Sequence, residues 1–276
     1  MSNGILYIAT GEDYRREAIV SAQSVRNEMP SIRIGIIADS RPSTDVFDDV
    51  IIIEEPDYSF TDQIHHLSDS PYDRTIYLDT DIHVEDSISE LYRLLDEFDI
   101  GLAHAQGGTS WEVDGVPASF PEYNSGVVIY NTDIIDGFSE DWLKNYAVTN
   151  EDRPQNQPSL RKTLYESDLR IATLPREYNC MYRQPGHVNS LIKIFHGRLI
   201  KVDGPGAGMY HDPYDAINKL NQYDQSRVFI QLGGLTVHTN RSDSLLHQIR
   251  LSIRQRGIKY TVRRGIQKVL NHLKNA

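Results

Sequence analysis

The sequence predicts an α/β fold, a three-layer α/β/α sandwich around a mainly parallel central sheet, followed by a C-terminal helical tail. Short apolar runs alternate with helical stretches over the first 200 residues, which is the pattern of strands connected by helices. Several of these runs end on polar residues, where open α/β sheets bind their ligands. The tail is predicted from charge, because residues 241–276 hold nine Arg or Lys and one acidic residue in a chain of net charge −11.

The strands are predicted from β-favouring apolar runs that turn residues bound. The first run ends at Thr10-Gly11 and the second at Asp39. The turn Asn124-Ser125-Gly126 leads into another strong run. The expected strands are 5–9, 32–38, 50–53, 76–78, 100–104, 127–131, 170–174 and 192–195.

The helices are predicted from apolar residues at three- and four-residue intervals. In the first helix these are Ala18, Ala22 and Val25, and Pro30 closes it. The third has Ser87 as its predicted N-cap, with a glutamate at the capping-box position. The expected helices are 13–29, 61–68, 87–98, 134–146 and 157–166.

Two aspartates, Asp79 and Asp81, follow the buried strand at 76–78. Carboxylates with one residue between them at a strand end can share a divalent cation and the group that it carries. The alternative is an ordinary Asp-rich turn, since Asp is common at turns and helix caps.

Two loops interrupt the alternating pattern. The segment 107–123 contains Trp111 and is long for a connector, and such loops are often functional. The segment 204–208 is rich in glycine, but no strong strand precedes it and no clear helix follows. We interpret it as a plain loop and not as a phosphate-binding loop.

Composition excludes several classes of protein. The single cysteine, Cys180, excludes internal disulfides and a cysteine-based zinc site. No apolar run is long enough to span a membrane, and the first ten residues do not resemble a signal peptide. We therefore expect a cytoplasmic protein. The acidic residues before the tail argue against nucleic-acid binding by the main domain, assigned to 1–240.

The tail, assigned to 241–276, resembles a basic amphipathic helix pair interrupted near Gly257. Such a pair suits the surface of an anionic bilayer, which would make the protein peripheral on the inner face of the cell membrane. Two alternatives remain, a helix docked on its own acidic domain and a nucleic-acid contact.

Five features occur in an order that is typical of one family. They are Ala9-Thr10 with Tyr14, the run from Ser70-Pro71 to Asp79-Thr80-Asp81, Asn124-Ser125-Gly126, Asn156-Gln157-Pro158, and His196 at a strand end. Over residues 4–200 the sequence resembles a glycosyltransferase of the GT-A fold, close to family 8, the glycogenin and lipooligosaccharide galactosyltransferase type. The resemblance implies a DXD motif and metal-dependent transfer from a nucleotide-sugar donor, a UDP-sugar, to a glycan or lipid-linked acceptor.

The resemblance also implies roles at the donor site. The nucleotide would contact Ala9, Thr10, Tyr14 and Asp39, and Arg74 would contact the donor. Asn124 would face the donor sugar, and the pair Asn156-Gln157 would lie beside it, with Gln157 beneath the sugar that is transferred.

The implied metal ligands are Asp79, Asp81 and His196, and His238 is an alternative histidine ligand. Carboxylates suit Mn²⁺ or Mg²⁺, and one imidazole favours Mn²⁺. Such an ion would neutralise the charge of a diphosphate leaving group.

The sequence departs from the family pattern at two points. Asn156 stands where the family has Asp, which leaves the sugar identity and a retaining mechanism open. The family's Lys-Pro-Trp ending is absent, so Arg198 or Lys201 would contact the diphosphate. Two other classes compete with a transferase, an inactive sugar-binding module and a sugar nucleotidyltransferase. A nucleotidyltransferase would have a Gly-rich loop with a Lys after the first strand, and this sequence has no such loop there.

Overall fold

The computed structural model describes residues 1–107, 111–149, 155–201, 212–231 and 234–239. The chain divides into two compact units, Met1–Val237 and His238–Ala276, and the account below concerns the first. The predicted tail at 241–276 and the Gly-rich segment 204–208 lie outside the described residues. The predicted domain boundary at residue 240 stays a prediction.

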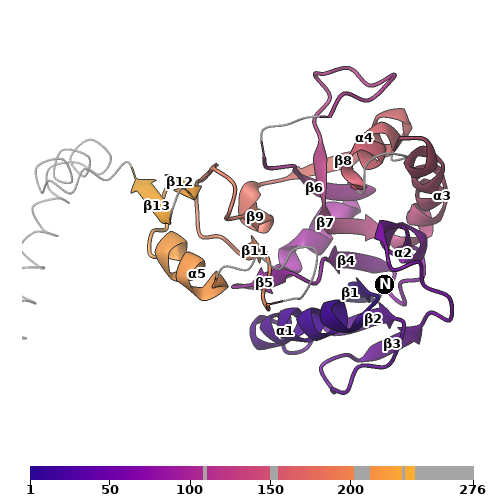
Figure 1. Ribbon diagram of the computed structural model, residues 1–276, viewed down its shortest axis with the longest axis horizontal. Helices are drawn as coiled ribbons and strands as arrows, with labels where there is room; N and C mark the ends of the chain where they lie inside the picture. The colour runs from indigo at the N-terminus through magenta and orange to yellow at the C-terminus, as the bar shows by residue number, and fades with distance from the viewer. Residues whose placement is uncertain (108–110, 150–154, 202–211, 232–233, 240–276) are drawn as a thin grey trace, which may run out of the picture. The chain divides into compact units, whose positions relative to one another are not determined.

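A central sheet forms the middle layer of the first unit (Figure 1). Seven strands of the described residues make it, in the order β3-β2-β1-β4-β7-β6-β8. Their bounds are β1 (Asn3–Ala9), β2 (Arg33–Ala38), β3 (Asp49–Ile52), β4 (Arg74–Leu78), β6 (Ile100–His104), β7 (Tyr123–Asn131) and β8 (Ile171–Leu174). Only β7 is antiparallel to its neighbours, β4 and β6, among these described strands. The predicted mainly parallel α/β sheet is therefore confirmed.

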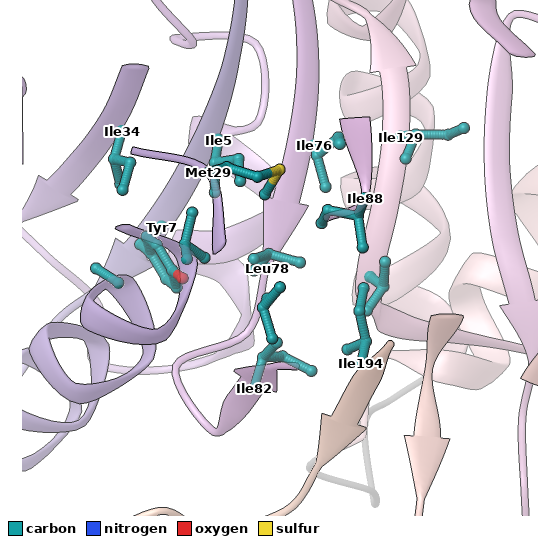
Figure 2. Close-up of a cluster of buried hydrophobic side chains, with 14 of the residues drawn as sticks. Ile5, Tyr7, Met29, Ile34, Ile76, Leu78, Ile82, Ile88, Ile129 and Ile194 are labelled. Carbon is teal, nitrogen blue, oxygen red and sulfur yellow. The ribbon is translucent and has the colours of Figure 1, made fainter. Parts of the chain in front are cut away.

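The two faces of the sheet carry different helices. Because side chains alternate along a strand, Ile5 and Tyr7 of β1 join a buried cluster that includes the apolar side of α1 (Glu12–Glu28) (Figure 2). Leu6 and Ile8 join a second cluster on the other face. That cluster contains residues of α2 (Phe60–His66), α3 (Thr132–Thr149) and α4 (Gln157–Glu166). The sheet thus has one helical layer on each side.

A second, smaller sheet brings the histidine of the site to the aspartates. It consists of β5 (Ile82–Val84), β11 (Ile194–His196) and β9 (Cys180–Met181), with β11 in the middle. The antiparallel register pairs His196 with Ile82, next to Asp81 in the chain. The sequence predicts a late strand at 192–195 that ends on His196, and the structure places His196 at the end of β11 but begins the strand at Ile194.

Two other expectations are wrong in detail. The predicted capped helix at 87–98 is the 3₁₀ helix η1 (Ser89–Asp96), whose N-cap makes no side-chain hydrogen bond. Glu90 instead accepts hydrogen bonds from Tyr178 and Lys193. Asn124, Ser125 and Gly126 form part of β7 and not a turn before it.

Several elements were not expected from the sequence. They are η2 (Arg176–Tyr178), β10 (Gly186–Val188), α5 (Pro213–Asn221), β12 (Arg227–Gln231) and β13 (Leu235–Thr239). Within the part of the chain that the structure describes, no helix has the length and apolar character needed to cross a bilayer.

A buried arginine holds the long segment between β6 and β7. Arg161 of α4 is almost fully buried, and its guanidinium donates to the carbonyl oxygens of Trp111, Pro117 and Phe120 over 2.7 to 3.0 Å. The planar five-donor group suits such multiple contacts, which lysine could not reproduce. The described part of this loop is therefore anchored to α4.

We predict that Arg161→Met loosens this loop and leaves the central sheet folded. Hydrogen bonds to charged groups contribute about 1.5–3 kcal/mol each, so amide exchange over residues 111–120 should become at least about tenfold faster. Hydrogen–deuterium exchange measures this. Lys144→Met, an exposed substitution on α3, is the control, and equal loop protection in both variants would contradict the anchoring role.

Candidate metal and nucleotide site

The site lies at the carboxyl edge of the parallel strands. β1 ends before Thr10, β2 before Asp39 and β4 before Asp79. Because β7 runs the opposite way, its first residues reach the same edge, and the Asp79 N–H donates to the Gly126 carbonyl oxygen at 2.8 Å. The strand order therefore collects polar groups from distant parts of the chain at one place.

Asp79, Asp81 and His196 form a group suited to a metal ion. One ligand atom from each residue lies within 4.8 Å of the others. His196 Nε2 is 3.2 Å from Asp81 Oδ1 and 3.8 Å from Asp79 Oδ2. His196 is buried, and the two aspartates are partly buried. This donor set, two carboxylates and one imidazole, is typical of a site for a divalent cation.

The other ring nitrogen of His196 is fixed by a chain of amides. Nδ1 lies 2.8 Å from Asn179 Oδ1, and Asn179 Nδ2 donates to Asn124 Oδ1 at 2.7 Å. An amide oxygen can only accept, so Nδ1 carries a proton and Nε2 faces the aspartates. Partners of this kind orient metal-binding histidines. Asn124 acts here through Asn179.

The three groups influence one another's ionisation. Burial raises the pKa of Asp79, an effect that the Asp81 carboxylate reinforces and His196 opposes. Burial also opposes ionisation of Asp81, but His196 and Arg198 outweigh it and lower the pKa of that carboxyl. Burial disfavours a charged His196, yet the two aspartates raise the pKa of its imidazole. The cluster thus favours a positive charge near its carboxylates.

The absence of a side chain at Gly126 creates the space for this cluster. A Cβ atom there would lie 2.4 Å from His196 Cε1, 2.8 Å from Asp79 Oδ2 and 3.0 Å from Asn124 Oδ1. Distances under 3 Å require a neighbour to move. The glycine of the Asn-Ser-Gly segment is therefore a spacing requirement of the site.

A buried glutamate connects the aspartate loop to the segment after His196. Glu17 of α1 is fully buried and accepts from Thr80 Oγ1 at 3.1 Å, Arg198 Nη1 at 2.6 Å and the Leu199 N–H at 2.9 Å. Burial raises the pKa of Glu17, the nearby Asp81 adds to this, and Arg198 opposes it. The Arg198 guanidinium also lies over the Tyr14 ring, 5.2 Å from its centroid.

The predicted nucleotide-contacting residues lie together at the ends of β1 and β2. Ala9 is the last residue of β1, and Thr10 follows it. Asp39 accepts a hydrogen bond from the Gly11 N–H at 3.0 Å and pairs with Arg15. Burial opposes the charge of Asp39, but these contacts lower its pKa. Tyr14 is 45% exposed at the start of α1.

Asn156 and Gln157 begin α4 in different surroundings. Asn156 is buried in an amide network, donating to Gln63 Oε1 at 2.8 Å and accepting from Ser125 Oγ at 3.2 Å. Because a carboxylate could not make the first of these bonds, the network explains an Asn at this position. Gln157 lines a cavity of about 530 Å³.

That cavity is lined mainly by neutral polar and aromatic groups of the loop after β6 and the start of α4. Besides Gln157, its described lining includes Gln106, Trp111, Glu122, Gln155 and Gln184. Glu122 accepts a hydrogen bond from the Trp111 N–H at 3.1 Å.

Arg74 does not join the other predicted site residues. It is the first residue of β4, at the end of the strand opposite to Asp79. Its guanidinium pairs with Asp96 at 2.6 Å and donates to the Tyr92 carbonyl. A strand rises about 3.3 Å per residue, so the length of β4 separates Arg74 from the aspartates. The expected donor contact of Arg74 is therefore not supported by its position.

Sequence reasoning did not identify Glu17, Asn179 or Gln63. Each is polar and buried. The burial of a polar residue in a helix or loop depends on packing against distant segments, so the local sequence does not predict it. Glu17 falls beside the apolar stripe of its helix, and this was the single available signal.

Comparison with known proteins agrees with the predicted fold. No protein-family model and no curated protein matches the chain. Among solved structures, the galactosyltransferase LgtC in complex with donor and acceptor sugar analogs is similar, with 16% identity, a TM-score of 0.54, and coverage of 79% of this chain and 95% of that one. The chain has the GT-A glycosyltransferase fold.

A second similar structure is the glycosyltransferase GlyE of Streptococcus pneumoniae TIGR4. It has 15% identity and a TM-score of 0.52, and the match covers 66% of this chain and 47% of that one. At these identities the likeness concerns the fold. Both neighbours are glycosyltransferases by name, in agreement with the class predicted from the sequence.

We predict that Gly126→Ala weakens binding of a divalent cation at this group, with Mn²⁺ as the probe, by about 10- to 100-fold, the range seen when the surroundings of metal ligands are changed. The new methyl group displaces His196 or Asp79. Titration of Mn²⁺ followed by electron paramagnetic resonance measures this. Gly137→Ala, where a Cβ meets nothing within 4 Å, is the control, and unchanged affinity in Gly126→Ala would show that the site tolerates the crowding.

We predict that Glu17→Ala lowers the free energy of unfolding by about 3–5 kcal/mol, the cost of removing one partner of a buried ion pair. The substitution leaves Arg198 and the Leu199 N–H without their acceptor. Urea denaturation measures the change. Glu12→Ala on the exposed side of the same helix is the control, and a loss in Glu17→Ala no larger than in the control would refute the linking role.

Proposed function

We propose that this protein is a metal-dependent glycosyltransferase that moves a sugar from a UDP-sugar to a saccharide acceptor, with retention of configuration. The observation that carries the proposal is the group Asp79, Asp81 and His196 at the carboxyl edge of the sheet, within a GT-A fold. The neighbouring Arg198 and the cavity that Gln157 lines supply the other parts of such a site.

The residues fit Mn²⁺, with Mg²⁺ as the second choice. Two carboxylates and one imidazole suit the softer of these ions, since Mg²⁺ strongly prefers oxygen ligands. The orientation of His196 by Asn179 leaves Nε2 directed to the aspartates. When bound, the ion would neutralise charge that develops on the diphosphate leaving group.

Arg198 is proposed to bind the donor diphosphate. Its guanidinium lies between Glu17 and the Tyr14 ring, and its charge influences Asp81. A fixed positive charge at this position stabilises the leaving group as the glycosidic bond breaks. Glu17 holds the guanidinium in place, so little reorganisation is needed during the reaction.

The sugar and the acceptor are proposed to occupy the cavity at the start of α4. Gln157 would lie beneath the transferred sugar, and Trp111 would stack on a face of the acceptor, because sugars present apolar faces to aromatic rings. Glu122 is tied to the Trp111 backbone. An inverting mechanism needs a carboxylate that acts as a base on the acceptor. Glu122, the carboxylate in this cavity, is engaged by the Trp111 N–H, whereas Gln157 is neutral, so we propose retention.

Two further parts of the proposal rest on the sequence. The acceptor is a glycan or a lipid-linked saccharide, and the basic tail at 241–276 binds an anionic membrane surface. These would place the protein in the cytoplasm, at the inner face of the cell membrane.

We predict that Asp81→Ala removes metal-dependent UDP binding. Even changes around metal ligands cost about 10- to 100-fold, so loss of a ligand should cost about 100-fold or more. Calorimetric titration of UDP with Mn²⁺, with Mg²⁺ and without a divalent ion measures this, and Asp133→Ala, an exposed aspartate on α3, is the control. Metal-independent UDP binding by both variants would overturn the metal site.

Turnover distinguishes an enzyme from a binding module. Wild-type protein with Mn²⁺ should slowly hydrolyse a UDP-sugar without acceptor, and Asp81→Ala should not. Binding of UDP without hydrolysis or transfer for any UDP-sugar in a panel would favour the sugar-binding module.

A further inference from the structure

Tyr58 has an unusual backbone conformation. Its φ is 53°, and it is the one non-glycine residue with positive φ among those that the structure describes. For a bulky side chain this region is unfavourable, and such strain is concentrated at functional sites. The ring gains little from burial in return, because Tyr58 is 63% exposed.

A buried aspartate fixes the strained residue to the end of β1. Asp62 is buried at the start of α2 and accepts from the Tyr58 N–H at 2.9 Å and from the Asp57 N–H at 2.8 Å. The same carboxylate accepts from Thr10 Oγ1 at 2.6 Å. The turn that carries Tyr58 is therefore held against Thr10, at the edge where the site lies.

Tyr58 and Tyr14 both approach Gly11. A Cβ atom on Gly11 would be 3.7 Å from Tyr14 Cδ2 and 4.0 Å from Tyr58 Cδ1. Gly11 has a φ of 96° and no side chain, so none of its own atoms occupies the Cβ position near the two rings. Two exposed aromatic rings that approach one glycine are suited to form a short slot for a ligand, because planar heteroaromatic rings stack well on aromatic side chains.

The slot is connected to the metal site through Arg198. The guanidinium lies over the Tyr14 ring and pairs with Glu17, which also holds Thr80 between the two aspartates. A ligand with a planar ring in the slot and a diphosphate at Arg198 would therefore reach Asp79 and Asp81. A nucleoside diphosphate has this order of groups.

We infer that Tyr58 is a nucleobase-binding residue that, with Tyr14, forms a slot for the base of a nucleoside diphosphate. This inference rests on the proposed function, because it assigns the base-binding part of the donor site. Tyr58 adopts its strained conformation so that the ring remains available to the ligand and does not join the core.

The test compares ligands with and without a base. UDP, ADP, GDP and CDP, and inorganic pyrophosphate, are titrated calorimetrically in the presence of Mn²⁺ into wild type, Tyr58→Gly, Tyr58→Phe and Phe60→Ala. Glycine tolerates positive φ, so Tyr58→Gly should keep or raise the melting temperature. Phe60→Ala removes another exposed aromatic ring close to Tyr58 in the chain and is the matched control.

We expect Tyr58→Gly to bind the preferred nucleoside diphosphate about tenfold or more weakly, within the range for base–aromatic stacking. Its pyrophosphate affinity should equal that of wild type, and Tyr58→Phe and Phe60→Ala should bind within about threefold of wild type, because both keep the ring at position 58.

Three outcomes separate the possibilities. Equal nucleotide affinity in wild type and Tyr58→Gly would overturn the slot and leave the metal site standing. If wild type binds pyrophosphate as tightly as every nucleoside diphosphate, the slot is likewise overturned and the metal site stands. No binding of any of these ligands would overturn the proposed function, and the slot with it.

Discussion

The geometry of the candidate site depends on one buried carboxylate. Glu17 comes from the first helix, and its three hydrogen bonds reach the loop between the aspartates and the two residues that follow Gly197. A buried charge of this kind is costly unless every lone pair is used. Here the cost is offset by an arginine and a backbone N–H, so the position of Thr80 and that of Arg198 are determined together.

Electrostatic balance explains why so many acidic groups can share one edge of the sheet. Asp39 is matched by Arg15, Glu17 by Arg198, and the aspartate pair by His196. Each match is local and largely removed from water, so its strength does not depend on the net charge of the chain. In the proposed function, this balance would allow an acidic protein to bind a doubly or triply negative ligand, because the charges facing the ligand would be Arg198 and a cation held by the aspartates.

The sequence was sufficient for features that depend on local pattern. The run of apolar residues before Asp79, the polar strand ends at Thr10 and Asp39, and the alternation of strands and helices all follow from short-range chemistry. Arg74 shows the limit. It is close to Asp79 in sequence, but an extended strand directs the two residues to opposite edges of the sheet. The reversed direction of β7, the 3₁₀ geometry of η1 and the burial of Glu17 and Asn179 depend on packing between distant segments, which no local pattern encodes.

The pairing of β5 with β11 joins residues more than 100 positions apart, His196 with Ile82. Closing so long a loop is entropically unfavourable until the intervening strands have formed. The aspartates are therefore present in the chain long before they have a third ligand, and during synthesis the emerging polypeptide has no high-affinity metal centre. If the group holds a metal ion, as proposed, binding would be restricted in this way to a chain in which β5 and β11 have paired, and it would stabilise the native contact.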